Sequence, residues 1–139
     1  MKYGNLILEK KEYVYLKRIL NISGYANDFE TQKSLTRLAE ELKTARVVDE
    51  HEMPDDIIRF NSHVYVSSEA GWNANLQIVI PADKDYENRK ISVLTPMGAA
   101  LFGYAQSDEV DWDFPKGRQR LKINKVILDQ NSDKIEVPI

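Results

Sequence analysis

Apolar residues recur at spacings of three and four along the first 45 residues, which is the period of an amphipathic helix. One stripe, between about Glu9 and Leu20, consists of Tyr13, Leu16, Ile19 and Leu20. A second stripe follows a polar break at 21–28 and consists of Leu35, Leu38, Leu42 and Ala45. Two such helices bury their stripes best by packing against each other, so the pattern predicts a short antiparallel helical hairpin.

The period changes to two beyond residue 62. Val64 and Val66 alternate with more polar neighbours, and a second alternating run extends from Leu76 to Ile80, where Pro81 ends it. This alternation is typical of strands. The segment 49–62 lies between the two patterns; it is rich in Asp and Glu and contains a proline that prevents a continuous helix.

Residues 90–126 contain the strongest local signals of the chain. Ile91 and Val93 indicate a largely buried strand. Thr95 then suits the N-cap of a helix, because its hydroxyl can accept a hydrogen bond from the first turn, and Pro96 suits the first helical position. Gly103 predicts the end of this short helix, since glycine readily takes the left-handed conformation.

The two strands that follow have charged faces of opposite sign. Acidic residues occupy alternate positions of 109–113, and Arg118, Arg120 and Lys122 share one face of the next strand. Pairing the acidic face with the basic face places Asp113 opposite Arg118. A three-residue loop that paired Phe114 with Arg118 would mismatch both faces, so the charge-matched register is predicted.

Together these patterns predict an α+β chain with three parts. The helical hairpin spans 1–48, an acidic linker spans 49–62, and a sheet domain with one short helix spans 63–139. The 139 residues are 42% hydrophobic and 29% charged, which is typical of a globular protein with one principal core.

The composition also narrows the classes of function. A net charge of −3 argues against strong direct binding of nucleic acid, and no apolar run approaches the length of a membrane span. The chain has no cysteine, and its two histidines, His51 and His63, lack the spacing of a zinc site, so no metal or cofactor is expected. A cytoplasmic monomer is the expectation that fits these features, without a signal peptide.

No arrangement of residues in the sequence predicts catalysis. There is no supported serine–histidine–acid set, and Gly98 and Gly103 flank a helix rather than form a phosphate-binding loop. The basic residues between Lys116 and Lys125 suggest at first sight a surface that binds nucleic acid. The neighbouring acidic strand neutralises much of their charge, so a solvated, charge-paired sheet face is favoured.

Residues 90–126 resemble the C-terminal domain of the GreA/GreB transcript-cleavage factors. The features that match are the strand Ile91-Ser92-Val93, the helix start Thr95-Pro96, the run Ala99-Ala100-Leu101-Phe102-Gly103 and the turn Pro115-Lys116-Gly117. Within that family, the segment His51–Ser62 is similar to the subgroup of regulators of nucleoside diphosphate kinase, whose hairpin is short. The resemblance implies an FKBP-like antiparallel sheet domain that binds bacterial RNA polymerase.

The resemblance also implies two candidate sites. Residues in the positions of Thr95, Pro96 and Met97 are implicated in polymerase contact, although these residues also suit a plain helix start. Two acidic residues at the hairpin tip help the cleavage factors to hold a metal ion, and the tip here offers Asp28 and Glu30. Capping of the second helix explains the same two carboxylates and is the favoured interpretation.

The resulting expectation is a non-enzymatic transcription regulator that binds RNA polymerase at its secondary-channel entrance. It competes there with Gre factors and does not stimulate transcript cleavage. The alternative is a Gre-type cleavage factor that uses the tip carboxylates with polymerase-held metal. A third, weaker alternative is an FKBP-like interaction domain with another protein partner.

Overall fold

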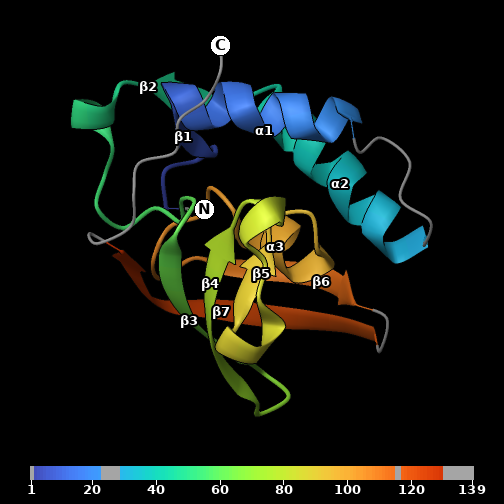
Figure 1. Cartoon of the computed structure of the whole chain (residues 1–139). Coiled ribbons are helices and arrows are strands. Elements are labelled where there is room, and N and C mark those ends of the chain that lie inside the picture. Colours follow the sequence, from blue (N-terminus) through green and yellow to red (C-terminus); the bar gives the residue numbers. More distant parts are fainter. Residues whose placement is uncertain (1, 23–28, 115–116, 130–139) are drawn as a thin grey trace.

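The computed structural model describes residues 2–22, 29–114 and 117–129. Two helices and a two-stranded parallel sheet come from the N-terminal part, and a five-stranded sheet with a short helix comes from the rest (Figure 1). The N-terminal elements are β1 (Ile7–Glu9), α1 (Lys10–Ile22), α2 (Phe29–Leu42) and β2 (Arg46–Val48). The remaining strands and helix are β3 (Ser62–Ser68), β4 (Asn73–Val79), β5 (Lys90–Ser92), α3 (Pro96–Leu101), β6 (Glu109–Phe114) and β7 (Gly117–Leu128).

The large sheet has the strand order β5-β4-β3-β7-β6 and is mixed, which corrects the expectation of an antiparallel sheet. Three of its strand pairs are antiparallel, but β4 and β5 run parallel, with Ile78 opposite Ile91. The cause lies in the connection between them. Pro81 cannot continue the ladder, and two 3-10 turns, Pro81–Asp83 and Tyr86–Asn88, carry the chain back before β5 begins.

The register between β6 and β7 is the charge-matched one that the sequence predicts. Asp113 lies opposite Arg118, and the ladder continues by one pair to Phe114 and Gly117. Farther along, β7 contains an irregularity: Tyr65 pairs with Lys125 but Val66 pairs with Ile123, so Asn124 is an extra residue. This bulge resets the alternation of faces, which explains how Ile123 and Val126, three positions apart, are both buried.

A single main core joins the helices to the sheet. The predicted helical stripes supply Leu16, Leu35, Leu38 and Leu42, and all four are buried with residues of α3 and the sheet. The ring of Phe60 contacts Tyr15 of α1 edge-on, with centroids 5.7 Å apart, and Phe102 after α3 at 4.7 Å. The two N-terminal helices therefore pack on the sheet unit, in addition to any contact with each other.

The segment 49–62 is acidic at its start and apolar at its end. Ile57, Ile58 and Phe60 are buried, and the backbone of Ile58 is hydrogen-bonded to Gly103 and Tyr104. The sequence predicts a linker here, and the structure places its second half in the core. The division of the chain into domains stays a prediction.

Two further features complete the architecture. The parallel pairing of β1 with β2 places Leu8 opposite Val47, so the segments before α1 and after α2 meet; the sequence indicates only an extended stretch at 5–8. Arg37 of α2 donates a hydrogen bond of 2.9 Å to the backbone oxygen of Asp111, which covers part of the β6 edge. In the part of the chain that the structure describes, no helix combines the length and apolar character needed to cross a membrane.

Candidate functional site

The start of α3 has the geometry that its sequence predicts. Thr95 is the N-cap, with an extended backbone, and its hydroxyl oxygen accepts a hydrogen bond of 3.0 Å from the backbone N–H of Gly98. The same hydroxyl donates to the backbone oxygen of Ser92 at 2.8 Å. Pro96 occupies the first helical position, where the missing N–H leaves no intrahelical bond unmade.

Gly98 holds α3 unusually close to the strand that precedes it. A β-carbon at this position would lie 2.3 Å from the backbone oxygen of Ser92 and 2.9 Å from the α-carbon of Val93. Only glycine allows this approach. The helix start is therefore fixed against the end of β5 by backbone contact and by two bonds of the Thr95 hydroxyl.

Thr95, Pro96 and Met97 are consecutive and half-buried, so each presents part of its surface to solvent. Met97 also packs on the main core. The structure thus brings the three predicted polymerase-binding residues together on one rigid helix start. Their contact with polymerase stays a prediction.

The structure describes only part of the second predicted site, which the sequence places at the tip of the expected hairpin. Asp28 lies outside the described residues. Glu30 falls in the first turn of α2, and its side chain is not among those described. Both the metal-binding and the capping interpretations of these carboxylates stay predictions.

An ion network with one buried carboxylate, Glu12, joins α1 to the segment before β3. The guanidinium of Arg59 lies 2.7 Å from a carboxylate oxygen of Glu12 and makes two further bonds, of 2.6 and 2.8 Å, to Glu50. Glu12 also accepts a hydrogen bond of 3.2 Å from the backbone of Phe60. Burial raises the pKa of Glu12 to about 7, although the Arg59 guanidinium acts in the opposite direction. The sequence gives no sign of this network, because its partners lie 47 and 9 positions apart.

This network predicts a pH dependence of stability. Folding raises the pKa of Glu12 above its ordinary value, so the folded state binds more protons than the unfolded state between about pH 4.5 and 7. The contribution of Glu12 is therefore most favourable below that window and is lost as the pH rises through it. Urea unfolding should show that the free energy of unfolding is lower at pH 8 than at pH 5. Glu12→Gln should reduce this difference by about 1–3 kcal/mol. The matched variant Glu40→Gln, at an exposed carboxylate of α2, should leave the difference unchanged.

Three exposed side chains, Asp49, His51 and Glu52, place possible ligand atoms within 4.8 Å of one another. Asp49 and Glu52 form a capping box around the 3-10 turn Glu50–Glu52, and that role accounts for their closeness. The other histidine, His63, lies on β3 with its Nε2 3.5 Å from Asp129. No metal site follows from either arrangement among the described residues.

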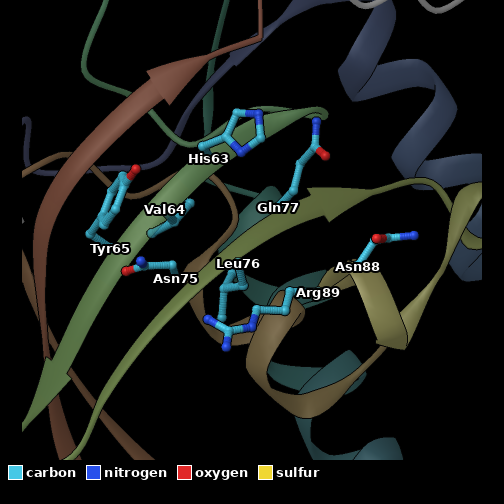
Figure 2. Close-up of a pocket in the computed structure, with 8 residues that line it drawn as sticks. All are labelled: His63, Val64, Tyr65, Asn75, Leu76, Gln77, Asn88 and Arg89. Carbon is cyan, nitrogen blue, oxygen red and sulfur yellow. The ribbon is translucent and has the colours of Figure 1, made fainter.

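A hollow of about 200 Å³ lies on the outer face of the large sheet (Figure 2). Eight residues line it: His63, Val64, Tyr65, Asn75, Leu76, Gln77, Asn88 and Arg89. The first six come from β3 and β4, and the last two come from the turn before β5. The alternation of β3 and β4 in the sequence indicates that His63 and Tyr65 point outward. The position of Arg89 beside the hollow depends on the connection between β4 and β5.

Residues 53–127 match the family model described as the C-terminal domain of the transcription elongation factors GreA/GreB. This segment makes up just over half of the chain and includes α3, the outer-face hollow and the five strands of the large sheet except the last residue of β7. The chain belongs to the GreA/GreB family. The resemblance to this family that residues 90–126 indicate is confirmed.

Relatives in the GreA/GreB family carry two kinds of name. The regulator of nucleoside diphosphate kinase of Escherichia coli K12 is 33% identical over 78 residues, covering 55% of this chain and 57% of the relative. Transcription elongation factor GreA of Clostridium beijerinckii is 37% identical over 94 residues, covering 67% of this chain and 59% of the relative. The chain thus spans little more than half the length of these two GreA/GreB-family relatives.

The fold of the GreA/GreB family extends over nearly the whole chain. A solved structure of a prokaryotic GreA/GreB transcription elongation factor from Nitrosomonas europaea superposes with a TM-score of 0.71 at 31% identity. The match covers 89% of this chain and 98% of that one. The structural match therefore extends beyond residues 53–127, which the family model covers.

Proposed function

We propose that this protein is a transcription regulator that binds bacterial RNA polymerase at the entrance of its secondary channel. Membership of the GreA/GreB family is the observation that carries this proposal, because its named members include transcription elongation factors. The start of α3 supplies the contact surface in this proposal. Thr95, Pro96 and Met97 are half-exposed there and are held rigidly, which lowers the entropic cost of binding.

The protein itself catalyses no reaction in this proposal, and it does not stimulate transcript cleavage. The helices α1 and α2 have 13 and 14 residues. At 1.5 Å per residue each arm is about 20 Å long, which is short for a tip that must travel along a channel to reach an active site. The protein acts by occupying the channel entrance, and it competes there with longer-armed Gre factors.

The alternative is a Gre-type cleavage factor, in which Asp28 and Glu30 hold a metal ion together with polymerase. Carboxylates bind Mg²⁺, but such a site needs further ligands that the polymerase or the RNA would supply. The short helices favour the proposal over this alternative.

RNA cleavage by backtracked polymerase complexes separates the two functions. We expect no cleavage with the protein alone, and inhibition of cleavage when it competes with a Gre factor. Cleavage that requires the protein and disappears in Asp28→Ala/Glu30→Ala would instead establish the alternative. If the protein neither stimulates RNA cleavage nor inhibits the cleavage that a Gre factor stimulates, binding at the secondary channel is refuted as well.

A further inference from the structure

The outer face of the large sheet combines an exposed aromatic ring with amides and cations. Tyr65 is 37% exposed on β3, and its neighbour across the ladder on β4 is Asn75. In Figure 2, the guanidinium of Arg89 points toward the side on which Asn75 and Tyr65 lie, whereas Asn88 points away from them. Lys125 of β7 lies on the other side of Tyr65, directly opposite it in the ladder.

The charges on this face are segregated along β7. The acidic strand β6 reaches only as far as the pair Glu109–Lys122, and its Asp111 lies 3.0 Å from Arg120. Lys125 is three positions beyond the end of that ladder, and its ladder partner is Tyr65 of β3. The charge pairing that the sequence predicts therefore holds for the first part of β7 and does not extend to Lys125.

The cations beside Tyr65 lack such pairing. Among the described residues, neither Arg89 nor Lys125 forms an ion pair or a side-chain hydrogen bond. The carboxylate at this site is that of Asp129, which lies 3.5 Å from both His63 and Gln77, at the end of the hollow formed by those two residues. Positive charge is thus available on both sides of Tyr65, and the carboxylate of Asp129 lies at the end of the hollow beside His63 and Gln77.

From this arrangement we propose that the outer sheet face binds single-stranded RNA. One base stacks on Tyr65, the amide of Asn75 makes hydrogen bonds to the base or the ribose hydroxyl, and Arg89 and Lys125 contact successive phosphates. Sheet faces bind RNA in this way elsewhere, with aromatic rings as stacking platforms and cations along the backbone. The neutral polar groups favour RNA over DNA because they can donate to and accept from a 2′-hydroxyl.

The size of the hollow fits a strand better than a free metabolite. Its volume of about 200 Å³ is open to solvent and falls below the range of about 300–1,000 Å³ that is usual for enclosed small-molecule sites. A base with its sugar fits there, while the rest of the strand lies on the surface. The net charge of −3 limits the long-range attraction, so the binding is weak and local and agrees with the absence of strong nucleic-acid binding expected from composition.

Fluorescence anisotropy of a labelled single-stranded RNA of about a dozen nucleotides, titrated with the full chain at low salt, tests the site without polymerase. Tyr65→Leu should weaken binding about tenfold, and Tyr65→Phe should restore it, because the stacking ring is retained. Arg89→Gln should weaken binding severalfold and lower the salt slope by about 0.7, the value for one phosphate of a single strand. Arg46→Gln, which removes an exposed cation from β2, is the matched control and should change nothing.

Several outcomes would overturn the RNA site. These are an absence of saturable binding, equal weakening by Arg46→Gln and Arg89→Gln, or equal losses in Tyr65→Phe and Tyr65→Leu. Equal affinity for a mononucleotide would assign the hollow to a free ligand, and tighter binding of single-stranded DNA would refute the choice of RNA. An effect of Tyr65→Leu on polymerase affinity alone would make the face a protein interface. Since polymerase is absent from the RNA titration, its result does not depend on the proposed function.

Discussion

Pro96→Arg should reduce the affinity for bacterial RNA polymerase by on the order of 100-fold and leave the protein folded. An anchor at the centre of an interface contributes 2 kcal/mol or more, and a long cation in place of the half-exposed ring blocks close approach to the start of α3. Arginine is a good helix former, and the N-cap bond of Thr95 to Gly98 does not involve the proline ring. The measurement is a polymerase-binding titration, with circular dichroism to verify the fold.

The chain offers a matched control for this substitution. Pro81 is also half-buried and also begins a helical turn, at the first position of a 3-10 segment. Pro81→Arg introduces the same side chain at the same kind of position but on the connection between β4 and β5. Equal losses in the two variants, or an unchanged affinity in Pro96→Arg, would remove the start of α3 from the polymerase-binding surface.

Gly98→Ala should destabilise the protein by about 3 kcal/mol, against the ordinary preference for alanine in helices. In a helix interior alanine is favoured over glycine by about 1 kcal/mol. Here the added β-carbon would lie 2.3 Å from the backbone oxygen of Ser92, and a backbone atom cannot turn away as a side chain does. Either α3 or the end of β5 must shift. Urea unfolding, with a midpoint and slope for each variant, measures the loss.

Gly71→Ala separates this steric effect from the general cost of replacing a glycine. Gly71 has a positive φ of 97°, but a β-carbon there would meet nothing within 4 Å. Its substitution should therefore cost only about 1 kcal/mol of backbone strain. If Gly98→Ala is no worse than Gly71→Ala, α3 does not depend on close backbone contact, and the rigidity attributed to the predicted binding surface is absent. Gly98→Ala should also weaken polymerase binding, because it displaces Thr95.

What the sequence determined by itself was local. The cap and first residue of α3 followed from the hydroxyl of Thr95 and the fixed φ of Pro96, and both lie where they were predicted. The register of β6 on β7 followed from charge alternation, because a shift by one residue would have turned every side chain to the wrong face. The strand at Ile91, the residues of α3 and the turn that begins at Pro115 also carried the resemblance to the GreA/GreB family, which the family match confirms. In each case the physical cause acts between residues close together in the chain.

What only the tertiary structure decided depends on segments that are far apart in the sequence. The parallel pairing of β4 with β5 and the bulge at Asn124 arise from the path of connections and from the packing of both faces, which no short pattern specifies. The same reason explains why Ile58 is buried in the main core, and why the periodicity of the sequence does not predict the pair Glu12–Arg59. The hollow that brings Arg89 near Tyr65 exists because the chain folds back after Pro81, and a sequence read in order places those two residues 24 positions apart.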